Sequence, residues 1–546
     1  MKRRDFVRFA ATTGVLGPIG GCVKDVPSLC FASELMKPDA TLVIDTHTHI
    51  FNATDLPVKN FISKVVARDH GFQEIAEVFG GLLEFIGWRA APTVEKELEK
   101  LRMLRSCADS EMTNSLAGMR QAIYSQSVAE LRTAAEQELA RVGIPRARMR
   151  DRTTLSNTGE ALRGIYQLPD SYEAYTQAFD EDEPFGIRRK SLTSGIAFIV
   201  EMFQYRITSA YNYLAIYNND ATTPVDLIAA ALVDYDWWLS AGVGTPSSLP
   251  DQVDLMGELA IVTAGRAHML VPFCPFRQII ANSGSSAARF DPLALVRTAV
   301  EEKGALGVKL YPPMGFAPYG NAQLDIWRDK GLPGPASNPQ FGAMLDDALR
   351  QLYNYCQDKG VAVMAHSSPS NAAHRDYLAL MGASFFEQLV TEFPDLNISL
   401  GHFGGTGSGD SLSLEHYMAF LAGGSNHRFA DASYFANLED APETLKSTLL
   451  SIYRFQQGAL IPRLNYGSDW KMLVAEAQSK RYLSGFRNLI QQIEAETGYN
   501  IMTEFLGGNA ARMYGLRTGQ ARQRLNEFYR ANQLDSPVWI SKVDRN

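Results

Sequence analysis

The sequence is poor in cysteine, and the cysteines it has form no recognisable cluster. The 546 residues include five cysteines, at positions 22, 30, 107, 274 and 356. No two of them are spaced as CxxC, so a cysteine-ligated zinc cluster is not expected. Their separations do not indicate a disulfide scaffold either, although a single disulfide stays compatible with the sequence. The fold must rest mainly on an apolar core, for which 46% hydrophobic residues are ample.

Excess positive charge and long apolar runs are also lacking. The formal net charge is −8, and no Lys/Arg-rich run follows the N-terminus, so no nucleic-acid partner is expected. No later segment has 18 or more uninterrupted apolar residues, which argues against a membrane-spanning helix. Internal repeats and low-complexity tracts are absent from the sequence. The length suits one large domain with insertions.

The N-terminus, MKRRDFVRFAATTGVLGPIGGC, is basic and then weakly apolar. Arg3 and Arg4 with the residues that follow resemble a twin-arginine export signal. We therefore expect residues 1–32 to be a signal peptide, read by the twin-arginine export machinery, and the protein to reach the periplasm. Residues 19–22 also resemble a lipoprotein-processing box, which would anchor the protein through a lipid at Cys22 on the outer side of the membrane. Plain cleavage near Cys30 and an ordinary basic N-terminus are the alternatives.

Short apolar strands alternate with amphipathic helical patterns over much of the chain. A β-branched run at 41–44 is the first strand, and the alternation resumes near residue 226. Helical patterns include 292–303, 341–359, 384–393 and 411–422. Eight strand–helix units imply parallel strands and predict an α/β fold of the (β/α)8 TIM-barrel type; a doubly wound sheet is the alternative. The eight expected strands cover residues 41–44, 227–234, 267–272, 306–310, 361–365, 398–400, 428–432 and 462–466.

Polar residues with metal-binding or acid–base chemistry follow several of these strands. Side chains alternate along a strand, so two histidines two residues apart, in "DTHTHIF", point the same way and can grip one ion. Barrel enzymes build their sites at the C-terminal ends of strands, so these residues are expected to converge, although each alone could be a satisfied loop residue. The candidates are His47, His49, Lys309, His366, His402 and Asp469. His374 lies just beyond His366 and is a poorer candidate.

The motifs "DTHTHIF", "AHSS", "LGHFGG", "GSDW" and "EFLGGNAARMYGL" together resemble the amidohydrolase superfamily. The most similar branch is the amidohydrolase-related group that includes aminocarboxymuconate-semialdehyde decarboxylase. The resemblance covers 41–54 and 226–517, which we expect to form the barrel. Residues 518–546 are expected to be a C-terminal tail.

The resemblance implies roles for the strand-end residues. His47, His49, His366 and Asp469 are expected to bind one divalent metal, most simply zinc, with manganese, iron or cobalt as alternatives. Asp469 would also shuttle a proton. The imidazole of His402 would polarise the substrate. Lys309 occupies a position where a carboxylated lysine bridges two metals in binuclear relatives, and an ordinary lysine in others.

Residues 55–225 do not fit a standard barrel. They form a long connection after the first strand, with a mostly helical pattern. A loop after the first strand emerges on the active-site face, so we expect a helical cap, with a dimerisation module as the alternative. A homo-oligomer is therefore one prediction. Arg277, just past the third strand, is expected either to bind a substrate carboxylate or to form a structural ion pair.

Three functions are compatible with the sequence. The first is a metal-dependent hydrolase that uses a metal-activated water on an amide, ester or lactone of a small molecule. The second is a non-oxidative decarboxylase or hydratase of an unsaturated or aromatic acid. The third is a non-catalytic metal-binding lipoprotein. The intact set of strand-end residues argues against the third, and the export signal slightly favours the first.

Overall fold

The computed structural model describes residues 41–66, 84–105, 109–141, 164–175, 198, 200–218, 224–328, 330–408, 414–424, 426–435, 438, 441–473 and 479–545. The predicted export signal at 1–32 and the proposed lipid site at Cys22 lie outside these residues. Among the described helices, none is both long and apolar enough to cross a membrane.

Eight strands form a single parallel sheet in the order of the sequence, β1-β2-β3-β4-β5-β6-β7-β8, which confirms the predicted TIM barrel. Most predicted boundaries hold to within two residues, but β1 begins later and includes His47. The seven other strands lie close to the predicted ranges. The strands are β1 Ile44–Thr48, β2 Leu227–Ala231, β3 Ala267–Pro272, β4 Gly307–Leu310, β5 Ala362–His366, β6 Ile398–Gly401, β7 Arg428–Asp431 and β8 Leu464–Asn465.

The barrel closes between β8 and β1 through a small number of backbone contacts. The amide of Thr46 donates to Tyr466 O at 3.1 Å, and the amide of Asp469 donates to His47 O at 2.7 Å. Thr48 and Trp470 form an isolated parallel bridge. We call this junction, residues 46–49 and 466–470, the seam.

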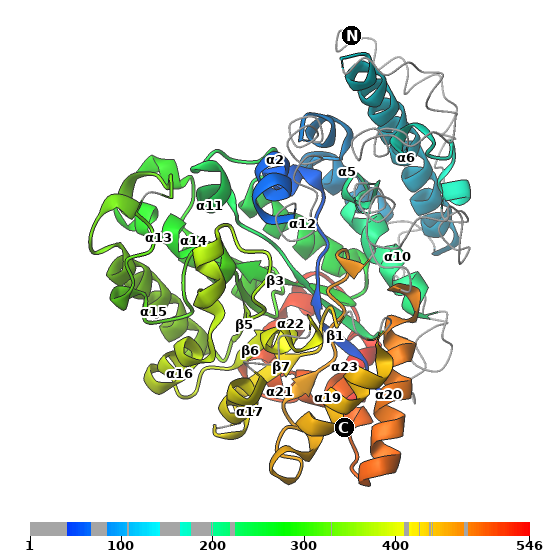
Figure 1. Cartoon of the computed structure of the whole chain (residues 1–546). Coiled ribbons are helices and arrows are strands. Elements are labelled where there is room, and N and C mark those ends of the chain that lie inside the picture. Colours follow the sequence, from blue (N-terminus) through cyan, green and yellow to red (C-terminus); the bar gives the residue numbers. More distant parts are fainter. Residues whose placement is uncertain are drawn as a thin grey trace.

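Helices cover the barrel between successive strands (Figure 1). Each barrel helix turns an apolar face to the sheet, as α15 does with its buried leucines. Between β2 and the chain end they are α11 Asp236–Ser240, α12 Leu249–Val262, α13 Pro275–Asn282, α14 Pro292–Glu302, α15 Phe341–Lys359, α16 Ala383–Glu392, α17 Leu414–Ala422, α19 Pro442–Arg454, α20 Tyr482–Thr497, α21 Asn509–Met513, α22 Gln520–Ala531 and α23 Val538–Arg545.

The predicted insertion between β1 and β2 is helical where it is described. Its helices α5, α6 and α10 lie on one side of the barrel, and α13, α15 and α16 lie on the other (Figure 1). The helix α10 reaches the seam, as described below. The elements are α2 Val58–Phe61, α5 Val94–Leu104, α6 Asp109–Arg141 and α10 Arg206–Asn218.

The expected C-terminal tail at 518–546 instead contains two helices, α22 and α23, packed on the N-terminal end of the barrel. Trp539 of α23 is fully buried and donates its indole N–H to Gly265 O at 2.8 Å. Lys542 pairs with the buried Asp226 just before β2 at 2.7 Å. The two helices close the N-terminal end of the barrel, where their apolar side chains pack against residues from several strands.

Candidate metal centre

The structure brings all six predicted strand-end residues to the C-terminal end of the barrel. They come from β1, β4, β5 and the loops after β1, β6 and β8. All are buried, with exposed fractions of 0% to 8%. They are His47, His49, Lys309, His366, His402 and Asp469.

Two histidines and one aspartate form a compact group of metal-ligand atoms. His47, His49 and Asp469 each offer one donor atom, and these atoms lie within 4.8 Å of one another. Asp469 Oδ1 is 3.2 Å from His49 Nε2 and 3.8 Å from His47 Nε2. The same carboxylate oxygen therefore faces both imidazoles.

Hydrogen bonds on the far side of each ring decide which nitrogen faces the group. His49 Nδ1 lies 3.0 Å from Ala231 O, a carbonyl that can only accept, so this nitrogen carries the proton. His47 Nδ1 lies 3.2 Å from Asp431 Oδ2, again an acceptor. Both rings therefore carry the lone pair on Nε2, the nitrogen that faces Asp469, as metal-binding histidines do. Two donors also reach these nitrogens: Lys309 Nζ lies 2.7 Å from His47 Nε2, and Tyr311 Oη lies 3.2 Å from His49 Nε2.

His402 and His366 lie beside this group. The ring of His402 is 4.6 Å from that of His47 and 4.5 Å from that of His366, centre to centre. His402 Nδ1 is 3.1 Å from Ser433 O. His366 Nε2 is 3.0 Å from Ser368 O, so its ring is held by its own loop, and its nitrogens are not part of the compact group.

Asp431, at the end of β7, is a site residue that the sequence analysis missed. Its Oδ1 accepts the amides of His402 at 2.9 Å and Ser433 at 3.1 Å, while Oδ2 faces His47. It thus fixes one ring and the backbone that carries another. The sequence clue was an acidic residue at the C-terminal end of the short apolar run in "RFADAS".

The electrostatics of the site favour neutral His47, His366 and His402 beside charged carboxylates, because burial lowers the pKa of these three imidazoles. Burial, with Lys309 nearby, lowers the pKa of His47 to about 3. Burial would raise the pKa of Asp431, but His47 and His402 hold it below its usual range. Burial would also raise the pKa of Asp469, but the contact with His49 and the nearby His402 and His47 lower it. At neutral pH these groups therefore have the protonation states that metal ions require.

Lys309 lies inside the same cluster. Its Nζ is 2.7 Å from His47 Nε2 and 3.3 Å from Met364 Sδ. Burial lowers the pKa of this ammonium group to about 8. Carboxylation requires the neutral amine, and a pKa of about 8 makes that form more accessible near pH 7 than in an ordinary lysine; the bridging role stays a prediction.

The donor set fits a divalent ion of borderline softness. Two imidazole nitrogens and one carboxylate oxygen converge, and the remaining ring nitrogens are tied to protein acceptors. A second group of donor atoms, from His47, His402 and Asp431, shares the first histidine. It is less suited to a metal, because the Asp431 carboxylate already accepts hydrogen bonds on both oxygens.

Small residues and left-handed backbone make room for this cluster. A Cβ on Gly401 would lie 3.1 Å from His47 Cε1, and one on Gly467 would lie 3.1 Å from His47 Cβ. His402 and Asp469 have φ values of 65° and 58°, which L-residues seldom adopt and which cluster at functional sites. The glycines of "LGHFGG" and "YGSDW" thus accommodate the imidazole of His47.

Arg277 lies in α13, and its guanidinium is engaged by protein groups. Its Nε and Nη2 donate to the two carboxylate oxygens of Asp234 at 2.8 and 2.6 Å, and Nη2 also contacts Asp236 at 3.3 Å. Its Nη1 donates to Ala288 O at 3.0 Å. These contacts are those of the structural ion pair, and substrate binding by this residue stays a prediction.

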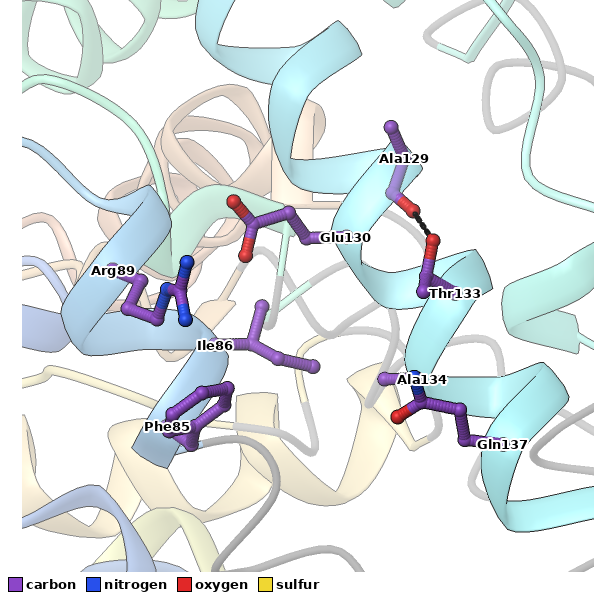
Figure 2. A pocket seen from close by; sticks show the side chains of 8 residues that line it. All are labelled: Phe85, Ile86, Arg89, Ala129, Glu130, Thr133, Ala134 and Gln137. Carbon is purple, nitrogen blue, oxygen red and sulfur yellow. Dashed lines mark hydrogen bonds between the residues drawn. The ribbon is translucent and has the colours of Figure 1, made fainter. Parts of the chain in front are cut away.

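A separate cavity lies within the insertion. It has a volume of about 330 Å³ and opens between residues 84–90 and α6. Arg89 and Glu130 extend toward one another across it (Figure 2). The lining residues are Phe85, Ile86, Arg89, Ala129, Glu130, Thr133, Ala134 and Gln137. None of the predicted site residues lines it.

Comparison with known proteins supports the superfamily. Residues 285–516 match a family model described as amidohydrolase, which covers Lys309, His366, His402 and Asp469 but not the two histidines of β1. The match supports assignment of this part of the barrel to the amidohydrolase superfamily. No curated protein matches the sequence.

Several solved structures are similar at a distance. An uncharacterized TIM-barrel protein from Bordetella bronchiseptica is 14% identical, with 57% of this chain and 82% of that chain covered and a TM-score of 0.34. A probable 2-pyrone-4,6-dicarboxylic acid hydrolase from Acinetobacter baumannii is 12% identical, with 62% and 95% covered and a TM-score of 0.33. A 5-carboxyvanillate decarboxylase from Sphingomonas paucimobilis is 14% identical, with 68% and 93% covered and a TM-score of 0.32. The assignment of the fold rests on the strand order, not on these values.

Proposed function

We propose that this protein is a metal-dependent hydrolase acting on an amide, ester or lactone of a small molecule. The observation that carries the proposal is the convergence of His47, His49 and Asp469 at the C-terminal end of the barrel. Members of the amidohydrolase superfamily typically bind a divalent metal, and the family match over 285–516 suggests an enzyme. Zinc is the first choice, since imidazole and carboxylate ligands suit it; manganese, iron and cobalt are alternatives.

The chain's own groups have distinct tasks in this proposal. His47 Nε2, His49 Nε2 and an Asp469 oxygen would hold the metal, with His366 as the expected further ligand. When bound, the ion would polarise the substrate carbonyl and lower the pKa of a water molecule. Asp469, whose Oδ1 faces both β1 histidines, is placed to accept a proton and return it to the leaving group. His402 is proposed to polarise the substrate at the developing oxyanion. Because its Nδ1–H faces Ser433 O at 3.1 Å, its Nε2 would have to take up a proton before it could donate there.

A non-oxidative decarboxylase or hydratase is the second candidate. An acid substrate needs a cationic anchor near the reacting centre. The ammonium group of Lys309 is buried within the site, whereas the Arg277 guanidinium is taken up by Asp234 and Asp236. Lys309 is therefore the residue on which the decarboxylase alternative depends.

Metal content is the first test. The purified protein is expected to carry about one equivalent of zinc or manganese by elemental mass spectrometry. His47→Ala/His49→Ala should lose it, because two of the converging donors are gone. His374→Ala is the matched control, since this histidine is 44% exposed and lies outside the group. Two equivalents would indicate a carboxylated Lys309 bridge. No metal after supply during expression would contradict the proposal.

The reaction is tested on the metal-loaded protein. Ester, lactone and amide panels are expected to give turnover that is lost in the double histidine variant. Release of carbon dioxide from aromatic or unsaturated acids, without ester or lactone hydrolysis, would favour the decarboxylase. Bound metal with no turnover in either panel would favour the non-catalytic lipoprotein.

Export by the twin-arginine route, lipid attachment at Cys22 and homo-oligomerisation are also proposals. The first two concern residues outside the described part of the chain. Fractionation of cells expressing the full chain, with Arg3→Lys/Arg4→Lys as control, tests the export route. The protein is expected to be absent from the periplasmic fraction in that variant.

A further inference from the structure

The candidate ligands lie on both sides of the weakest junction of the barrel. His47 lies in β1 and His49 directly follows it, while Asp469 follows β8, which has only two residues in the sheet. One isolated bridge and a few backbone hydrogen bonds, including His49 N to Trp470 O at 3.1 Å, join the two sides. The distance between the ligands therefore depends on how firmly the seam is held.

A bulge in β1 lies between Asp45 and Thr48, in the stretch that contains His47. Asp45 pairs with Ile228 and Thr48 pairs with Ala230, so three steps along β1 match two steps along β2. Such a bulge changes the direction of the side chains that follow it. Buried Asp45 stands at its start.

The Asp45 carboxylate joins the two sides of the seam. Its Oδ1 accepts the amide of His47 at 3.0 Å and the amide of Ser468 at 3.0 Å. One oxygen atom thus holds the backbone of a candidate ligand and the residue before Asp469. Movement of this carboxylate would displace both ligand-bearing segments.

A tyrosine of the insertion holds this carboxylate from outside the barrel. Tyr213 of α10 donates its hydroxyl to Asp45 Oδ2 at 2.5 Å. Its ring packs edge-on against Trp470 of the seam, 5.3 Å between centres. Both Tyr213 and Asp45 are fully buried, so the contact is shielded from water.

A second contact ties the insertion to the loop after β1. Arg206, at the start of α10, is fully buried and pairs with Asp55 in that loop and with Glu97 of α5. Across the seam, Lys471 donates to Phe51 O at 2.5 Å. Arg206 Nη2 also donates to Asn52 Oδ1 at 3.4 Å, so Arg206 and Tyr213 of the insertion contact the chain on both sides of His49.

We propose that Tyr213 is a positioning residue for the metal site, and that the insertion, through α10, sets the separation of the candidate ligands across the seam. Tyr213 acts through Asp45, which fixes the bulge below His47 and the turn before Asp469. The inference rests on the proposed metal centre, and it gives the insertion a task other than covering the pocket.

The first test is the affinity for zinc of Tyr213→Phe, which removes one hydroxyl and keeps the ring. We expect the zinc dissociation constant to rise about 10-fold, as for other residues that orient metal ligands. Tyr453→Phe is the matched control: this α19 tyrosine is also fully buried, and its hydroxyl has no partner among the described residues. It should leave the zinc affinity unchanged. In Asp45→Asn, adding Tyr213→Phe should cause no further loss, because the tyrosine acts through that carboxylate.

The second test needs no metal. Amide hydrogen exchange of the full chain is measured by mass spectrometry in both tyrosine variants. Tyr213→Phe should speed exchange several-fold in residues 44–51 and 466–473, and leave β3 to β5 unchanged. Unchanged exchange at the seam, or an equal change throughout the barrel, would overturn the inference. Faster seam exchange in a protein that binds no zinc would refute the proposed metal centre and leave the positioning of the seam standing.

Discussion

Both ends of the barrel bury histidines, but the rings make different hydrogen bonds. At the N-terminal end, His268 of β3 has Nδ1 at 2.7 Å from Gly304 O and Nε2 at 2.7 Å from the hydroxyl of Tyr529. At the C-terminal end, His49 uses Nδ1 for Ala231 O and turns Nε2 toward Asp469. Both nitrogens of His268 are thus bound to structural groups, whereas His49 Nε2 faces a second candidate ligand, with the Tyr311 hydroxyl also 3.2 Å away.

The carboxylates of the two ends differ in the same way. At the N-terminal end, Asp226 accepts a hydrogen bond from Lys542 Nζ on one oxygen at 2.7 Å and from the amide of Val43 on the other at 2.9 Å. Asp469 Oδ1 instead faces two imidazoles whose protons lie on the far side. Burial is similar at both ends, so burial alone does not distinguish a functional residue from a structural one. The hydrogen-bond partners of each residue do distinguish the two.

The strongest test of this difference is Asp469→Asn against Asp226→Asn. The first change removes a metal ligand and the proposed proton shuttle, so kcat on an ester or lactone should fall about 10³-fold. The second leaves Lys542 buried without a charged partner, which should lower the free energy of unfolding by about 3 kcal/mol and leave kcat of the folded protein unchanged. Steady-state kinetics and urea unfolding of both variants provide the measurements. Equal losses of kcat would remove the distinction.

A smaller effect is expected for Asp431→Asn. The amide keeps the size of the side chain but no longer offers His47 Nδ1 an ionised acceptor, so the ring loses its preferred tautomer. Zinc affinity should fall 10- to 100-fold, as measured by competition with a chelator. Asp347→Asn is the control, because this carboxylate is exposed on α15 and pairs with Arg350. An unaltered zinc affinity for Asp431→Asn would show that the carboxylate does not orient the ring.

The strand-end residues could be predicted from sequence because their positions follow from local periodicity. An apolar run of four to six residues ends, and His366 or His402 follows at once, so the alternation of strands and helices suffices to place them on one rim. The same alternation was enough to predict the order of the strands in the sheet. The register of β1 was harder to predict, because the bulge between Asp45 and Thr48 becomes apparent only from its pairing with β2.

Residues whose role depends on distant partners could not be found this way. Asp431 looked like part of a strand, and only the fold brings it to His47, 384 positions away. Tyr213 gave no signal, since its partner Asp45 lies 168 positions earlier. The helices α22 and α23 were expected to be a tail, because their apolar faces find partners only on the base of a closed barrel.

The smallest effect on the metal site is expected for His268→Asn, and its signature is the pH dependence of stability. Burial lowers the pKa of His268 to about 4, against 6.5 for an unperturbed imidazole. As the pH falls through 6.5, the unfolded chain takes up a proton that the folded protein refuses, so this group costs stability until the pH approaches 4. At 1.36 kcal/mol per pH unit, the cost reaches roughly 3 kcal/mol.

In His268→Asn that cost is absent, so the difference between wild type and variant in the free energy of unfolding should shift by roughly 3 kcal/mol between pH 7 and pH 4. At pH 7 the variant should be less stable by about 1 kcal/mol, because the hydroxyl of Tyr529 loses its acceptor. Urea unfolding at several pH values measures both. Zinc content and kcat at pH 7 should match the wild type, because the ring lies at the opposite end of the barrel from Asp469. Loss of zinc in this variant would mean that the two ends are coupled, and hydrogen bonding of the rings would no longer separate structural from functional histidines.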